Sequence, residues 1–172
     1  MLFELIAVIV AGVAAGGVVM IVRRIIPALP RWLVPVVAGA AMLAVSISLE
    51  YSWFARNSAA LPEGVKVATV HENKAFWRPW TYAFPYVDRF IAVSQTGALE
   101  NEAAEGQKMT SLYIFGRWTP TRRIRAVFDC ESGRRADLLP GLVLGEDGSV
   151  PDSAWIDTGR DDPVTRTACA EA

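Results

Sequence analysis

The chain has 172 residues, of which 52% are hydrophobic, and a formal net charge of −1. A nearly neutral chain has no general electrostatic attraction to nucleic acid, so we expect no nucleic-acid partner. The length and the positive mean hydropathy fit one membrane hairpin followed by one compact domain.

Two apolar runs dominate the first part of the chain. Residues 5–22 and residues 32–49 contain no charged side chain. As helices, each run would span about 27 Å, close to the hydrocarbon thickness of a bilayer. Neither run shows the polar stripe of a surface helix, which argues against a hairpin buried in a soluble protein. We therefore predict a transmembrane hairpin over residues 1–50, with its two helices in these runs.

The connection at residues 23–31 indicates the direction of the hairpin. It carries Arg23, Arg24 and Arg31, whereas Glu4 is the only charged side chain before the first run. By the positive-inside rule this loop is cytoplasmic, so the N-terminus and the C-terminal domain lie on the other side. Arginine is common and lysine scarce, a bias typical of GC-rich bacterial genomes. We expect an inner-membrane protein of bacteria with both ends periplasmic.

Small residues recur four apart in both apolar runs, a spacing that lets helix backbones approach closely. They are Ala7, Ala11, Gly12, Ala15 and Gly16 in the first run and Ala40, Ala44 and Ser48 in the second. Such faces either pack the two helices on each other or dock a helix of a partner. Neither run carries an ionisable residue at mid-depth, which argues against a channel, a transporter or a proton relay.

After the hairpin, residues 51–62 predict a juxtamembrane connector and residues 63–172 an extracytoplasmic domain. Short apolar or β-branched runs predict strands at residues 65–70, 90–93, 112–115, 124–128 and 154–156. The predicted fold class is membrane-anchored α+β, a two-helix transmembrane hairpin followed by a small, mainly antiparallel β domain.

Three local patterns refine this domain. Pro120 marks the turn of a hairpin between the third and fourth predicted strands. Alternation would place Val65, Val67 and Thr69 on one face of the first strand. Asp162, followed by a proline, suits the N-cap of a short helix.

The chain contains two cysteines, Cys130 and Cys169. In an oxidising compartment they most simply form one disulfide, which would also hold the C-terminal tail. A redox-active pair would favour a Cys-x-x-Cys motif, which is absent. Together with the single histidine, His71, the cysteines fall short of a four-ligand structural zinc site. We expect no metal and no cofactor.

Residues 75–86 read A-F-W-R-P-W-T-Y-A-F-P-Y and are dense in aromatic side chains. Two prolines exclude an ordinary central strand here. One interpretation is core packing, with Arg78 over Trp77 or Trp80 as a cation–π pair. The other is a contact surface for lipid headgroups or a partner, formed by Trp77, Arg78, Trp80 and Tyr82. Aromatic residues in a small β domain are more often core, so we favour core packing.

Five arginines in the second half of the chain form a candidate anion patch: Arg122, Arg123, Arg125, Arg134 and Arg135. Such a patch would take a small anion or a lipid headgroup. The alternative is that these charges protect exposed strand edges from pairing with other chains.

No residue cluster specifies a reaction. His71 has no serine or cysteine near it in sequence and is interpreted as a surface residue. The Asp157-Thr158-Gly159 tripeptide resembles the catalytic loop of retroviral-type aspartic proteases, but the chain has no second copy, and we interpret it as a turn.

We therefore expect a non-enzymatic accessory or interaction subunit of a larger membrane assembly, in contact with the lipid bilayer and another membrane protein. The first alternative is an envelope binding or sensing module for a small anion or lipid headgroup. The second is a hydrolase acting through Asp157 or His71.

Overall fold

The computed structural model describes residues 2–96, 99–100, 106–140, 142, 145 and 149–170. The chain divides into two compact units, Met1–Ala55 and Arg56–Ala172. The first unit is helical and the second is built on a β-sheet.

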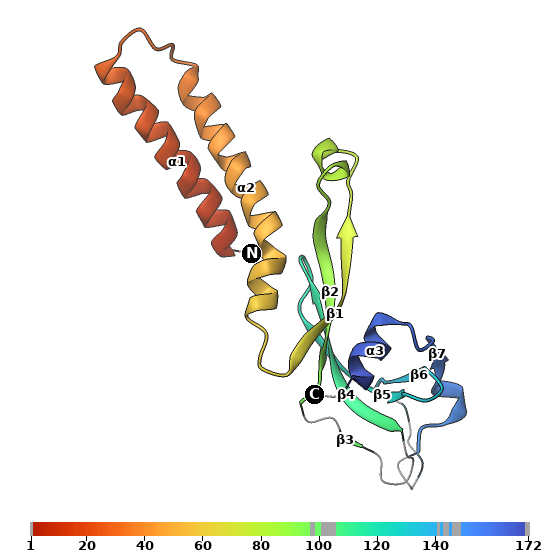
Figure 1. Ribbon diagram of the computed structural model, residues 1–172. Helices are drawn as coiled ribbons and strands as arrows, with labels where there is room; N and C mark the ends of the chain where they lie inside the picture. Colours follow the sequence, from red (N-terminus) through yellow and green to blue (C-terminus); the bar gives the residue numbers. More distant parts are fainter. Residues whose placement is uncertain are drawn as a thin grey trace. The chain divides into compact units, whose positions relative to one another are not determined.

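The first unit is a hairpin of two antiparallel helices, α1 (Leu2–Ile25) and α2 (Leu33–Ala59) (Figure 1). Both helices are long and apolar enough to cross a membrane. Each is longer than its predicted run, because good helix formers such as Glu4 and Arg24 continue the helix past the apolar residues. Their charges also suit the helix dipole, with the acid in the first turn and the base in the last.

The α2 helix continues well past its apolar run. It reaches Ala59, so much of the predicted connector at residues 51–62 is helical. Pro62 follows shortly after, where a proline cannot continue the helix. At 27 residues α2 is about 40 Å long, which exceeds the hydrocarbon thickness of a bilayer by about 10 Å.

Two glycines of α1 bring the helices together. Gly12 and Gly16 are buried. A Cβ atom added at Gly12 would lie 2.7 Å from Cγ of Met42, and one added at Gly16 would lie 3.6 Å from Cβ of Ala38. The missing side chain at Gly12 therefore lets Met42 of α2 pack directly on the backbone of α1.

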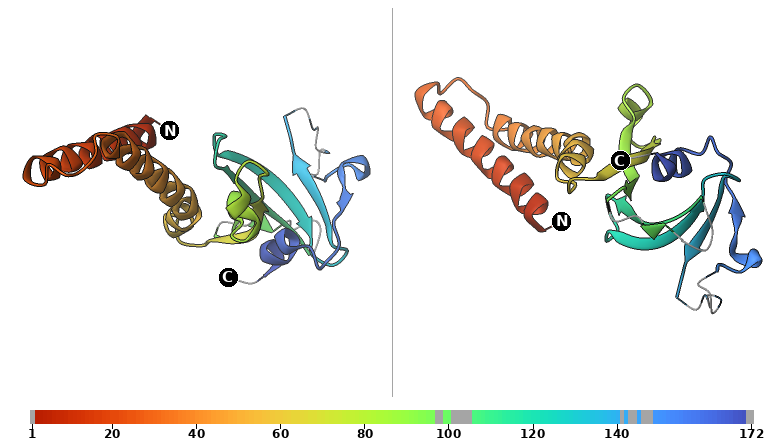
Figure 2. Two further views of the ribbon diagram at one scale, coloured as in Figure 1. Left: turned by 90° about the horizontal axis from the view of Figure 1, so that it is seen from above. Right: turned by 60° about the horizontal axis from the view of Figure 1, so that its bottom comes forward.

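The second unit is an antiparallel sheet with strand order β1-β2-β4-β5-β6-β7, and β3 pairs with β4 off this path. Its strands are β1 (Val65–Asn73), β2 (Tyr86–Ser94), β3 (Leu99–Glu100), β4 (Gln107–Gly116), β5 (Arg122–Asp129), β6 (Arg134–Leu138) and β7 (Ile156–Asp157). The antiparallel β domain predicted from the sequence is confirmed. Both views of Figure 2 show that the sheet curls strongly.

The main core lies between one face of the sheet and α3 (Pro163–Cys169). Phe128, Val93 and Leu112 from the strands pack there against Val164 and Ala168 of the helix. The predicted cap is present. Oδ2 of Asp162 accepts hydrogen bonds from the backbone N–H groups of Val164 and Thr165, at 3.1 and 2.9 Å.

The two cysteine sulfur atoms lie at bonding distance, 2.01 Å apart, and link positions 39 residues apart in sequence. Cys130 follows the last residue of β5, and Cys169 is the last residue of α3. The bond therefore ties the C-terminal helix to the central part of the sheet.

The predicted face of the first strand is wrong at one position. Val67 is opposite Ala92 of β2, and Thr69 is opposite Ile91. Because Ala92 and Ile91 are neighbours along β2, they point to opposite faces of the sheet. Val67 and Thr69 therefore do so too, and a β-bulge at Ala68 supplies the extra residue.

The strands near the C-terminus also differ from prediction. β6, with the sequence R-R-A-D-L, was not predicted, because it lacks apolar alternation. It is held by pairing with β5 from Asp129 opposite Arg134 to Arg125 opposite Leu138. The last strand, predicted at residues 154–156, is present but begins later, as β7 (Ile156–Asp157), because a short 3-10 helix, η2 (Asp152–Ala154), precedes it.

Candidate functional site: the aromatic end of the sheet

Two loops meet at one end of the sheet. The β1–β2 loop covers residues 74–85 and the β4–β5 loop covers residues 117–121. Arg89 of β2 pairs with Gly116, the last residue of β4. The backbone N–H of Arg117 then donates to the carbonyl of Asp88 at 2.8 Å. The two loops together are called the aromatic end below.

The β1–β2 loop is closed around a buried threonine. Pro79 begins a 3-10 helix, η1 (Pro79–Tyr82), in which Thr81 is 1% exposed. Oγ1 of Thr81 donates to the carbonyl of Arg78 at 2.7 Å and accepts from the N–H of Ala75 at 2.9 Å. The N–H groups of Ala83 and Phe84 both donate to the carbonyl of Trp80. The loop thus satisfies much of its own backbone.

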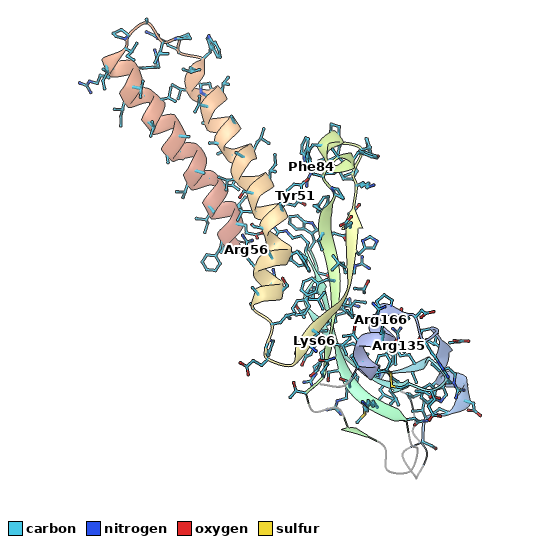
Figure 3. All side chains as sticks on the ribbon, viewed as in Figure 1. Tyr51, Arg56, Lys66, Phe84, Arg135 and Arg166 are labelled. Atoms are coloured by element: carbon cyan, nitrogen blue, oxygen red, sulfur yellow. A yellow bond between two sulfur atoms is a disulfide. The ribbon has the colours of Figure 1, made fainter. Side chains whose placement is uncertain are left out.

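The aromatic side chains of this loop point outwards. Five of them are between 43% and 79% exposed: Phe76, Trp77, Trp80, Tyr82 and Phe84. Phe84 is labelled at the loop in Figure 3. Trp118 in the β4–β5 loop is exposed as well. Among the described residues of the second unit, every exposed Phe, Trp or Tyr side chain lies in these two loops.

The preference for core packing is therefore wrong for these five side chains. The pairing of β2 with β4 stops at Arg89, whereas β1 and β2 stay paired as far as Asn73 and Tyr86. The loop lies beyond the last strand that flanks the hairpin, so no further strand of the sheet covers it. Tyr86, at the base of the loop, is buried.

Two arginines contact aromatic rings at this end. The guanidinium of Arg78 lies 5.9 Å from the ring centre of Tyr86, in place of the expected pairing with a tryptophan. The guanidinium of Arg117 is 5.1 Å from the ring centre of Trp118. Both distances are in the range of cation–π contacts.

His71 has a partner that its sequence neighbours do not indicate. Its Nδ1 atom lies 2.8 Å from Oδ1 of Asp88, and Nδ2 of Asn73 donates to Oδ2 of the same carboxylate at 3.1 Å. The histidine side chain is 66% exposed. Among the described residues, no hydroxyl or thiol hydrogen-bonds to either member of this pair. The geometry therefore places a histidine against a carboxylate, without the bonded hydroxyl or thiol that covalent catalysis would need in this described region.

The five arginines of the candidate anion patch do not share one environment. Arg123 donates to Oγ of Ser111 at 3.0 Å and lies over the ring of Tyr113. Arg122 and Arg125 are exposed, and neighbours along β5 alternate between the faces of the sheet. Arg122 is therefore on the face opposite to Arg123 and Arg125.

The other two arginines of the patch are bound to carboxylates. Arg134 donates to Oδ2 of Asp129 at 3.1 Å and lies over the ring of Trp155. Nε of Arg135, labelled in Figure 3, lies 3.0 Å from Oδ1 of Asp137. Because each of these two arginines is paired with a carboxylate, the five arginines do not form a single cationic patch.

Asp129 closes the turn that precedes β6. Its Oδ1 atom accepts from the backbone N–H groups of Glu131 and Ser132, both at 3.1 Å. Burial of the carboxyl acts to raise its pKa, but the hydrogen bonds from Ser132, Arg134 and the Glu131 N–H outweigh this effect, and the pKa of Asp129 is lowered.

The Asp157-Thr158-Gly159 tripeptide runs from the end of β7 into the turn at residues 160–161. Oδ1 of Asp157 accepts from the N–H of Gly159, and Oγ1 of Thr158 donates to the carbonyl of Gly133 at 3.1 Å. Asp157 lies on β7 and His71 on β1, the two ends of the strand order. In the part of the chain that the structure describes, no three His, Cys, Asp or Glu side chains gather as a metal site would require.

The small residues of the helices fall into two groups. Gly12 and Gly16 are buried between α1 and α2, and Ala11 and Ala15 beside them are half-buried. Ala7 is exposed, and so are all three small residues of the second row: Ala40, Ala44 and Ser48. The row on α2 therefore does not take part in packing the hairpin.

Comparisons with protein-family models, with curated proteins and with solved structures found no match. The function therefore has to be inferred from the residues and their geometry.

Proposed function

We propose that this chain is a non-enzymatic accessory subunit of a larger membrane assembly in the bacterial inner membrane. The hairpin α1–α2 spans the bilayer, and the β domain lies in the periplasm. The three arginines at residues 23–31 support this direction, because positive loops stay in the cytoplasm. The bonded pair Cys130 and Cys169 supports it too, because disulfides persist in oxidising compartments.

The observation that carries this proposal is the outward row of small residues on α2. Packing within the hairpin uses Ala38 and Met42 of α2 against the glycines of α1. Ala40, Ala44 and Ser48 lie on another side of the helix and are exposed. In a bilayer, helices gain affinity for each other mainly through close van der Waals contact, which small residues permit. The proposed partner is a transmembrane helix of another protein.

The experiment is purification of the full chain in mild detergent through a C-terminal tag, with identification and counting of co-purifying proteins. Ser48→Leu and Ala44→Leu should lose a near-stoichiometric membrane partner, because a larger side chain keeps the helices apart. Ser46→Leu is the matched control. Ser46 is also exposed, but it lies about 160° around the helix axis from Ser48.

A native chain that purifies as a lone monomer or as a homodimer would contradict the proposal. Equal loss of the partner in Ser46→Leu and Ser48→Leu would contradict the assigned face.

The two alternative functions have less support. An anion module on the five arginines would need Arg134 and Arg135, which are bound to Asp129 and Asp137. A hydrolase that acts at His71 through a serine or cysteine would need that nucleophile beside the histidine, and no hydroxyl or thiol bonds to the histidine in the described part of the chain.

A further inference from the structure

We propose that the aromatic end of the sheet binds the headgroup region of a bilayer that contains anionic phospholipid. This surface is distinct from the α2 row. The inference rests on the membrane hairpin of the proposed function but not on the partner helix proposed for α2. Three properties of the two loops support it. Their exposed side chains are aromatic, the backbone of the β1–β2 loop forms hydrogen bonds within the loop, and cationic side chains outnumber carboxylates.

The exposed side chains are of the kind found at membrane interfaces. Trp77, Trp80 and Trp118 carry an indole N–H on an apolar ring, and Tyr82 carries a hydroxyl. Such amphipathic rings concentrate where hydrocarbon meets headgroups. Phe76 and Phe84 in the same loop are fully apolar. A water-exposed cluster of this size is unfavourable for an isolated soluble domain, and it indicates an apolar or interfacial partner.

The backbone of the β1–β2 loop suits a medium with little water. Unsatisfied N–H and C=O groups are costly in lipid. Here the N–H groups of Arg78, Thr81, Ala83 and Phe84 all donate to carbonyls within the loop. The hydroxyl of Thr81 bonds the N–H of Ala75 as well. The aromatic side chains can therefore enter the membrane interface while the hydrogen bonds within the loop stay intact.

The charge around the loops is complementary to an anionic surface. Residues 72–89 and 116–123 contain two carboxylates, Glu72 and Asp88, of which Asp88 is paired with His71. The same segments contain six cationic side chains, of which Arg117 is buried and Arg78 half-buried. The four exposed ones are Lys74, Arg89, Arg122 and Arg123. Basic residues beside interfacial aromatics are attracted to anionic lipid. A long apolar hairpin in the same chain brings this domain to a membrane, which favours lipid over a soluble partner.

The test uses the full chain reconstituted into vesicles, with one fluorescent label on an introduced thiol. The native cysteines are bonded to each other, so Phe84→Cys supplies a single reactive site. Ser153→Cys is the matched control, because Ser153 is exposed in η2, which leads to β7 at the other side of the sheet. An environment-sensitive label is read in the presence of spin-labelled lipid and, separately, of aqueous iodide.

The proposal predicts that spin-labelled lipid quenches the label at position 84 several-fold more strongly than the label at position 153. Quenching should be stronger in phosphatidylglycerol vesicles than in phosphatidylcholine vesicles, and high salt should reduce the difference. Replacing Trp77 and Trp80 by serine in the Phe84→Cys chain should weaken lipid quenching, while the circular dichroism spectrum stays unchanged.

Two results would overturn the proposal. Equal iodide quenching at both positions, with no lipid quenching, would show that the aromatic end stays in water. Protection of position 84 from both quenchers would show that protein covers the loop. Neither result would affect the test of the α2 row, which is read by co-purification.

Discussion

Thr81 organises the β1–β2 loop, so removal of its hydroxyl should loosen that loop specifically. Thr81→Val keeps the volume of the side chain but removes the hydroxyl that bonds the N–H of Ala75 and the carbonyl of Arg78. The site is buried, since Thr81 is 1% exposed. A buried polar group that loses its partner costs about 1–3 kcal/mol. The free energy of opening the loop should fall by a similar amount.

The assay is amide hydrogen exchange at Ala75, whose N–H donates to Oγ1 of Thr81. Since 1.4 kcal/mol corresponds to a factor of ten, exchange in Thr81→Val should be about 10- to 100-fold faster than in the native chain. Thr81→Ser is the control, because it keeps the hydroxyl and removes only a methyl group. If the Ala75 amide exchanges at the native rate in Thr81→Val, the hydroxyl does not hold the loop and the reasoning is refuted.

Three further predictions concern packing and charge. Cys130→Ser should lower the free energy of unfolding of the β domain by about 3–4 kcal/mol in urea titrations, and a non-reducing thiol assay of the native chain should find no free thiol. Gly12→Val should destabilise the hairpin in detergent by about 1–3 kcal/mol, because the Cβ of the new valine would collide with Met42 of α2. Gly17→Val is the control and should not destabilise it, because a Cβ at position 17 would have no atom of α2 within 4 Å. The pKa of Asp129 is lower in the folded chain than in the unfolded chain, where it is about 3.9. The ionised carboxylate therefore stabilises the fold fully above the unfolded pKa, and this stabilisation is lost as pH falls through the folded pKa. Asp129→Asn should therefore lose less stability than the native chain as pH falls below about 4, and an equal loss would contradict this.

Features set by local sequence could be predicted, whereas features set by the register of distant strands could not. The apolar runs predicted the two long helices, and Asp162 predicted the start of α3, because helix signals lie within one or two turns. The contact between His71 and Asp88 depends on strand register across residues that are 17 apart. Strand β6 has no apolar pattern of its own and forms because β5 is beside it.

The candidate site shows the same division. The aromatic content of residues 75–86 is plain in the sequence, but its exposure depends on where β4 ends relative to the β1–β2 hairpin. The glycines of α1 and the small row of α2 look alike in sequence, yet only the glycines are buried. Which small residues face which helix is decided by how the two helices rotate against each other, and that rotation depends on side chains such as Met42.

Membrane topology is the claim on which both proposals rest. The most direct measurement places a reporter after the C-terminal residue, using one enzyme that is active only in the periplasm and one that is active only in the cytoplasm. A hairpin with its arginine loop at residues 23–31 inside predicts activity of the periplasmic reporter alone. Activity of the cytoplasmic reporter alone would contradict the orientation, the disulfide argument and the periplasmic site of lipid contact together.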